Sequence, residues 1–241
     1  MTGTNLHAVS GTDRSGLPAP YDIVILSRYR PALQCGRLLR RMDPTLRIAW
    51  ARDAKALETL SRCVLPDAKL VGFSTSVIVP ARLLPRFGGG AFNFHPGPPE
   101  FPGNHPSSFA IYADAPQFGV TFHRMIEAVD AGTILDCRRF PAAPYRTAPE
   151  LAAETFSRLV NLFAVNAGDL ARRDFIPQGC GEVWSGTKGT SARANAKRLL
   201  TAPLDDTELD RRIRSFQWIF SPIEGYGQQA RPYDSSASSS S

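Results

Sequence analysis

Apolar runs that alternate with helical segments most constrain how this chain can fold. Four runs with strand character lie at residues 21–27, 47–51, 69–74 and 90–95. They are apolar throughout rather than at every second position, which is typical of parallel strands covered on both faces. Helical segments separate them at 31–42, 53–60 and 80–87. The order predicts an α/β fold, a Rossmann-like and mostly parallel twisted sheet with helices on both faces.

The second half of the folded region adds strands and two helices. Residues 118–125 and 132–140 have strand character. A long helix should begin at Thr147, where a capping box includes Glu150, and end near Gly168. Its predicted buried stripe consists of Leu151, Phe156, Leu159, Val160 and Phe163. A last helix should begin at Asp205 and bury Leu209, Ile213 and Phe216.

Composition argues for a cytoplasmic protein whose cysteines are reduced. The four cysteines are scattered without a CxxC pair, so they suggest neither a zinc site nor a disulfide framework. No apolar run approaches the length of about 20 residues that a membrane span requires. The first twenty residues lack the apolar core of a signal peptide. We therefore expect no membrane association and a cytoplasmic location.

Positive charge is concentrated near the first helix. The net charge is +6, and residues 28–62 hold nine arginines and lysines against three acidic residues. Such a bias favours an anionic partner, although a solvated helix face explains it equally. Arg28 and Arg30 directly follow the first strand, so they are the candidates for binding an anionic part of a substrate.

An asparagine and a histidine end the fourth strand. Residues i and i+2 of a strand share a face, so Asn93 and His95 should project together, while Phe92 and Phe94 pack on the opposite side. Pro96 ends the strand directly after His95. Because open α/β sheets bind ligands beyond the carboxyl ends of their strands, we expect this pair to face a wet cleft.

Three motifs in this order identify a family resemblance. "FNFHPGPPEFPGNHP" from residue 92, "FGVTFH" from 118 and "AVDAGTIL" from 128 resemble the core of the folate-dependent formyltransferases. That family includes methionyl-tRNA, glycinamide-ribonucleotide and sugar-nucleotide formyltransferases and formyltetrahydrofolate hydrolase. The similarity extends over roughly residues 69–168. The resemblance implies that the chain is a folate-dependent N-formyltransferase whose formyl donor is 10-formyltetrahydrofolate.

The resemblance also assigns catalytic roles. The family's catalytic trio falls on Asn93, His95 and Asp130. Formyl transfer develops negative charge on the formyl oxygen, and Asn93 and His95 could donate hydrogen bonds to it. Asp130 could accept a proton from the attacking amine and orient the imidazole. His123 is expected to pack or hydrogen-bond behind this centre. A metal site is not expected, because the histidine spacings match no common ligand pattern.

The resemblance places the pterin of the folate between two loops. Candidates for its pocket are Val77, Ile78, Val79, Pro80, Ala128 and Val129. Aliphatic residues at these positions could equally belong to the core.

Departures from the family's pattern narrow the substrate. The first strand is followed by "RYRPALQCGR" instead of a glycine-rich phosphate loop, which argues against glycinamide ribonucleotide. Only about seventy residues follow the core, too few for the β-barrel with which transfer-RNA enzymes hold their substrate. Nucleic acid is therefore a poor candidate, and a small-molecule amine remains, such as an amino sugar on a nucleotide. Glu100 and Asn104, beside the catalytic strand, could contact it, and residues 184–200 could supply another wall.

The sequence divides into four segments. We expect a disordered N-terminus (1–20), a formyltransferase catalytic domain (21–185), a small C-terminal extension with one helix (186–233) and a disordered tail (234–241). The alternatives are a formyltetrahydrofolate hydrolase, a methionyl-tRNA formyltransferase-like enzyme without the barrel, and a non-catalytic folate-binding protein. The sequence does not determine the oligomeric state.

Overall fold

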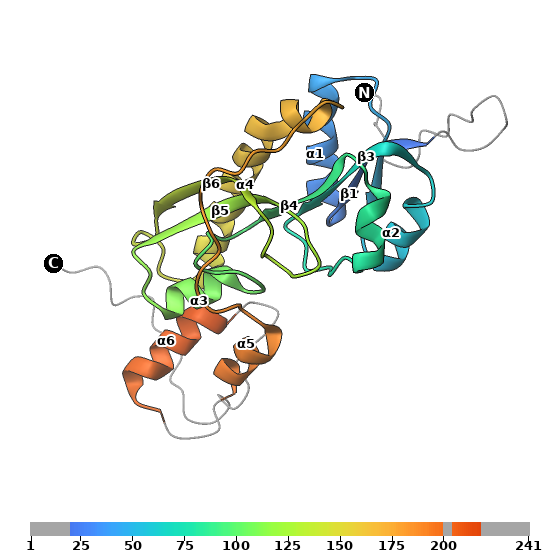
Figure 1. The fold of residues 1–241 in the computed structure, drawn as a ribbon. Coiled ribbons are helices and arrows are strands. Elements are labelled where there is room, and N and C mark those ends of the chain that lie inside the picture. The colour runs from blue at the N-terminus through green and yellow to red at the C-terminus, as the bar shows by residue number, and fades with distance from the viewer. Residues whose placement is uncertain (1–19, 200–203, 218–241) are drawn as a thin grey trace, which may run out of the picture.

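Six strands form a single sheet in the computed structural model, which describes residues 20–199 and 204–217. The strand order is β2-β1-β3-β4-β5-β6 (Figure 1). The strands are β1 (Tyr21–Leu26), β2 (Ile48–Ala51), β3 (Val64–Phe73), β4 (Gly90–His95), β5 (Gln117–Arg124) and β6 (Ile134–Pro141). The first four are parallel to one another, and β5 is antiparallel to both of its neighbours. The predicted α/β fold with a mostly parallel sheet is confirmed.

Helices connect the strands and extend beyond them. They are α1 (Tyr29–Met42), α2 (Ala54–Leu60), the 3-10 helix η1 (Ala81–Arg86), α3 (Pro106–Tyr112), α4 (Ala148–Ala171), α5 (Ser191–Arg198) and α6 (Asp206–Phe216). The predicted starts at Thr147 and Asp205 are confirmed, because each side chain accepts a hydrogen bond from a backbone N–H of the first turn. The end predicted at Gly168 was wrong, since α4 continues to Ala171. Neither α3 nor α5 was predicted.

The sheet has a helix layer on each face. In Figure 1, α1 and α4 lie beside each other on one face, where they cover Phe92, Phe94 and Phe122. Leu57 of α2 and Leu83 of η1 belong to a second core cluster on the other face. The alternation of side chains along β4 therefore places Asn93 and His95 on the face away from α1 and α4.

The predicted stripes of the long helices are only partly buried. Leu159 and Phe163 of α4 are buried, but Phe156 is 37% exposed, so its predicted place in the buried stripe was wrong. Its ring packs edge-on against Phe73 at a centroid distance of 5.9 Å and is otherwise left at the surface. In α6, Phe216 is buried, whereas Leu209 and Ile213 are half-buried.

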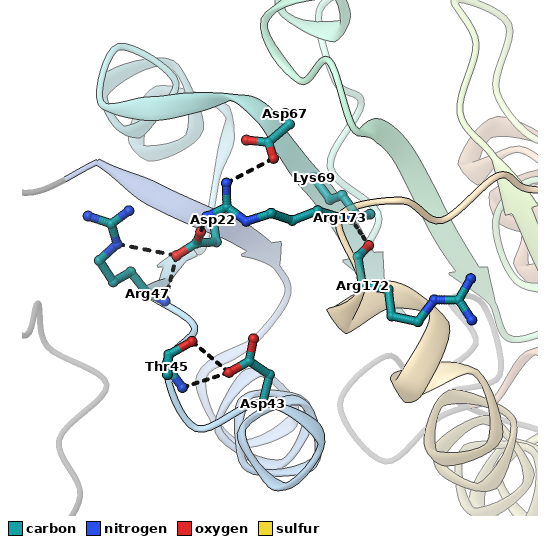
Figure 2. A network of polar contacts seen from close by, with 8 residues as sticks. All are labelled: Asp22, Asp43, Thr45, Arg47, Asp67, Lys69, Arg172 and Arg173. Atoms are coloured by element: carbon teal, nitrogen blue, oxygen red, sulfur yellow. Dashed lines mark hydrogen bonds and ion pairs between the residues drawn. The ribbon is translucent and has the colours of Figure 1, made fainter.

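A polar network fixes the end of α4 at the amino ends of β1 and β3 (Figure 2). Arg173 forms ion pairs with Asp22, at 2.8 Å, and with Asp67, at 3.1 Å. The buried Lys69 donates from Nζ to the carbonyl oxygen of Arg172 at 2.7 Å. Burial lowers the pKa of Lys69. The network lies at the amino ends of the strands, whereas Asn93 and His95 lie toward the carboxyl end of β4. We therefore assign it a structural role.

The helix α6 docks on α3, and α5 packs on α6 (Figure 1). The Tyr112 hydroxyl donates to Glu208 Oε1 at 2.8 Å and accepts from Lys197 Nζ at 2.6 Å. Phe216 packs against Phe109 and Tyr112. The predicted boundary at residue 185 stays a prediction, but the single helix expected after it was wrong, since both α5 and α6 lie there. The segments predicted to be disordered lie almost wholly outside the described residues.

Within residues 20–199 and 204–217, no helix combines the length and the apolar character needed to cross a membrane.

Candidate active site

The strand register places the predicted catalytic side chains beside those of the next strand. Asn93 of β4 lies opposite His123 of β5, and His95 lies opposite Thr121. Nδ2 of Asn93 is 3.2 Å from Nε2 of His123. The Thr121 hydroxyl donates to the Gly97 carbonyl oxygen at 2.7 Å, which fixes the loop after His95. These four side chains share the face that the two long helices leave uncovered.

Asp130 joins this group from the loop between β5 and β6. Its backbone adopts the left-handed conformation, with φ 45°, which is uncommon for any residue other than glycine. Its Oδ2 accepts a hydrogen bond from the Gly103 N–H at 2.7 Å. Oδ2 lies 3.4 Å from Nδ1 of His95, and Oδ1 lies 3.3 Å from Nε2 of His123. The carboxylate is therefore held between two imidazoles.

The backbone partners of the two imidazoles assign their tautomers. Nε2 of His95 lies 3.0 Å from the Phe101 carbonyl oxygen, so this nitrogen carries the hydrogen in the neutral ring. Nδ1 of His123 lies 2.8 Å from the Arg124 carbonyl oxygen and carries the hydrogen for the same reason. The other nitrogen of each ring faces Asp130. The N–H of His95 that we expected to serve an oxyanion is already engaged by Phe101.

Burial and charge set the protonation of the centre. Exposure is 3% for His95, 2% for His123 and 8% for Asp130, so the expectation that His95 faces a wet cleft was wrong. Burial lowers the pKa of His95, although the nearby Asp130 carboxylate acts in the opposite direction. Burial also opposes charge on Asp130, but His95, His123 and the Gly103 N–H outweigh it and lower the pKa of Asp130 to about 2. At neutral pH the Asp130 carboxylate is therefore ionised.

A tryptophan from the C-terminal part of the chain covers both imidazoles. The ring of Trp184 packs edge-on against His95 at 5.7 Å and against His123 at 4.9 Å. Its Nε1–H donates to the carbonyl oxygen of Gly132 at 2.7 Å. The sequence suggested a wall from residues 184–200, but nothing in it singled out Trp184.

The side-chain oxygen of Asn93 is pressed against the neighbouring strand. Gly72 of β3 is the register partner of Asn93. A Cβ atom at Gly72 would lie 2.6 Å from Oδ1 of Asn93. Among the described residues, this buried oxygen has no hydrogen-bond partner. The absence of a side chain at residue 72 therefore leaves room for the amide.

The loops predicted to hold a pterin meet on the same side of the sheet. Val77 and Val79 pack, together with Met125, against the core cluster that contains Leu57 and Leu83. Ile78 is 68% exposed. On the opposite loop, Ile126 and Val129 are also exposed, and Ala128 precedes Val129. Exposed aliphatic side chains are typical of a surface that an apolar ligand covers.

The four predicted substrate-binding residues occupy different environments. Arg28 and Arg30 line a cavity of about 590 Å³ together with Tyr29, Pro31, Gln34 and Phe156. Glu100 instead accepts a hydrogen bond from Arg139, at 2.7 Å, in an ion-pair cluster that includes Glu182. Asn104 is exposed, and its backbone N–H donates to the Gly189 carbonyl oxygen. The two arginines therefore share a cavity.

Comparison with protein families identifies the domain. Residues 55–161, which include Asn93, His95 and Asp130, match the formyl transferase family. The chain carries a formyl transferase domain. This confirms the resemblance to the folate-dependent formyltransferases. No curated protein sequence matches the chain.

Solved structures share the fold of the formyl transferase domain. A sugar N-formyltransferase from a Shewanella species has 17% identity and a TM-score of 0.66, covering 80% of this chain and 87% of that one. A 4-N formyltransferase from Francisella tularensis has 16% identity and a TM-score of 0.60, with 81% and 87% covered. The N-formyltransferase from Helicobacter canadensis, in complex with folinic acid and dTDP-3-aminofucose, has 17% identity, a TM-score of 0.62, and 82% and 81% covered.

Proposed function

We propose that the protein transfers a formyl group from 10-formyltetrahydrofolate to the primary amine of an anionic small molecule. The observation that carries the proposal is the buried carboxylate of Asp130 between His95 and His123, with the Asn93 amide adjacent, in a formyl transferase domain. Related structures bind folates: the Helicobacter canadensis enzyme was solved with folinic acid.

The residues present fit a reduced folate. Ile78, Ile126 and Val129 offer exposed aliphatic surface on the loops that follow β3 and β5. Val77 and Val79 are anchored in the core below, which would hold the loop in place when a flat pterin covers it. The bound folate supplies an activated formyl group.

Each side chain of the centre has a separate role in formyl transfer. Asn93 has a second N–H beyond the one directed at His123, and this N–H can stabilise negative charge that develops on the formyl oxygen. The attacking amine must lose a proton, and His95 can take it on Nδ1. Asp130 then stabilises the imidazolium, because its Oδ2 faces that nitrogen at 3.4 Å. Gly103 and Thr121 hold the loops that keep these groups in place.

The cavity near Arg28 supports an anionic amine, such as a nucleotide-linked amino sugar. It lies at the carboxyl end of β1, and only β3 separates β1 from β4. Since neighbouring strands lie about 4.8 Å apart, β1 and β4 are separated by roughly 10 Å within the sheet. Two guanidinium groups suit phosphate oxygens, and Tyr29 and Phe156 offer aromatic surface.

Substitution of the trio tests the proposal. Asn93→Ala, His95→Ala and Asp130→Asn should each reduce formyl transfer by about 10²- to 10⁴-fold in a protein that still folds and binds 5-formyltetrahydrofolate. The three losses should not add, because the groups act as one unit. His105→Ala, which changes an exposed histidine, is the matched control and should leave activity unchanged. Near-normal formylation by all three variants would refute the assignment.

Two further measurements separate the alternatives. Consumption of 10-formyltetrahydrofolate at full rate without any amine would establish a hydrolase. Saturating 5-formyltetrahydrofolate should raise the melting temperature, since a ligand at a hundred times its dissociation constant adds about 2.7 kcal/mol. An unchanged melting temperature would remove the folate from the proposal.

The arginines are tested with a charge-matched control. Replacing Arg28 and Arg30 with glutamine should raise the KM for the amine much more than it lowers kcat. Replacing Arg37 and Arg41 on α1, which do not line the cavity, removes the same charge and should change neither. Equal effects of the two double variants would indicate general electrostatics and not a binding site.

A further inference from the structure

A segment beyond the matched family region joins the two loops that carry the catalytic side chains. In this cover segment, residues 180–189, the Cys180 N–H donates to the carbonyl oxygen of Ile134, just after the Asp130 loop. Further along, Ser185 donates to Pro99 and Gly189 donates to Pro102, both in the loop that follows His95. The family match ends at residue 161. The segment therefore bridges the loops of His95 and Asp130 from outside the matched region.

Trp184 lies at the middle of the cover segment. Its N–H bond to Gly132 fixes the loop two residues after Asp130. Gly132 itself is packed closely on β5, because a Cβ atom there would lie 2.1 Å from the carbonyl oxygen of Arg124. The indole ring contacts the edges of His95 and His123. The Trp184 side chain thus contacts His95, His123 and the loop that carries Asp130.

We propose that Trp184 is a positioning residue for formyl transfer, which holds the Asp130 loop through Gly132 and shields the two imidazoles from water. The inference rests on the proposed function. The indole has two separable contributions, the hydrogen bond and the ring. The hydrogen bond sets the position of Asp130, and the ring keeps His95 buried.

Shielding has a consequence for the protonation of His95. The titratable groups that face this imidazole are Asp130, from the β5–β6 loop, and His123, from β5. Burial is the largest of the influences on the pKa of His95 and lowers it. Admitting water by removing the indole should therefore raise the pKa of His95, while Asp130 and His123 remain in place.

Two substitutions separate the contributions. Trp184→Phe keeps an aromatic cover and loses the hydrogen bond, so we expect kcat to fall about tenfold or more with little change in KM, because small misplacements of catalytic groups cost rate. Trp184→Ala also loses the cover, so the titration of His95 should move to higher pH. Val183→Ala changes the neighbouring residue, which is 74% exposed, and should alter neither quantity.

The test measures kcat and KM across pH together with the titration of the histidine rings by nuclear magnetic resonance. The chain has four histidines, and the signal of His95 is assigned with His95→Gln. Wild-type kcat in Trp184→Phe, together with an unmoved His95 titration in Trp184→Ala, would overturn the proposal. If Trp184→Ala does not fold, the kcat of Trp184→Phe alone decides the test, and a wild-type value then overturns the proposal. The titration needs no substrate, so an absence of formyl transfer in the wild type counts against the proposed function alone.

Discussion

Replacing Gly72 with alanine should damage catalysis without damaging the fold. The new Cβ atom would lie 2.6 Å from Oδ1 of Asn93 and 2.6 Å from Cε of Met125. Met125 can move, since the methyl group is the end of a flexible side chain. The Asn93 amide cannot move freely, because its Nδ2 donates to His123. The substitution therefore forces the amide away from the position that it holds in the centre.

The size of the effect follows from the displacement. Ordinary contact begins at 3.4 Å, so the amide oxygen must retreat by about 0.8 Å. A misplacement of about 1 Å in a catalytic group can cost roughly 100-fold in rate. That factor corresponds to about 2.7 kcal/mol in the activation free energy. We expect kcat of Gly72→Ala to fall by about this factor, while the affinity for 5-formyltetrahydrofolate changes little.

A second glycine provides the control. Gly168 lies in α4, and a Cβ atom there would have nothing within 4 Å. Gly168→Ala should keep full activity and raise the free energy of unfolding by about 1 kcal/mol, because alanine favours the helix. Turnover at saturating substrate and chemical unfolding are measured for both variants. A folded Gly72→Ala protein with wild-type kcat would show that the position of the Asn93 amide does not control the rate.

Three further predictions concern stability. Lys69→Met should lower the free energy of unfolding by about 1 kcal/mol, measured by urea denaturation, because the Arg172 carbonyl loses its donor; an unchanged value would contradict a stabilising role. Thr147→Ala removes the cap of α4 and should cost about 1 kcal/mol in the same assay, whereas Thr147→Ser should retain most of it. Asp130 has a lowered pKa, so its charge stabilises the fold above pH 4, and this contribution is lost as the pH falls through about 2. The difference in unfolding free energy between wild type and Asp130→Asn should therefore shrink by about 2 kcal/mol between pH 4 and pH 2; a constant difference would mean that the carboxylate is not stabilised in the fold.

The sequence predicted the elements whose signals are local. Continuous apolar runs marked the strands, and the caps at Thr147 and Asp205 marked helix starts, because the capping side chain and its partner lie three residues apart. The helix α5 escaped prediction because "SARANAKR" has no apolar stripe, and only Ala194 is buried. Phe156 fitted the helical spacing of a buried stripe, yet it packs on Phe73 with one side and lines the cavity of Arg28 with another, so it stays partly exposed.

The site was predictable as far as strand alternation and the family motifs extended. These brought Asn93, His95 and Asp130 together. The role of Trp184 was not predictable, because its contacts to His95 and His123 join segments far apart in the sequence. The engagement of the His95 N–H by Phe101 depends on how the proline-rich loop turns back on the strand, which spacing does not reveal.

The cover segment also affects the order in which the site forms during synthesis. A chain grows from its N-terminus at about 5–20 residues per second, and N-terminal parts fold first. The strands that carry Asn93, His95 and His123 therefore emerge before Trp184, and until residues 180–189 have followed, both imidazoles face water on the side that the indole later covers. A nascent chain would already have its sheet while His95 lacks the part of its burial that the indole supplies. The acid–base centre is thus completed late, by a segment that contributes no strand to the sheet.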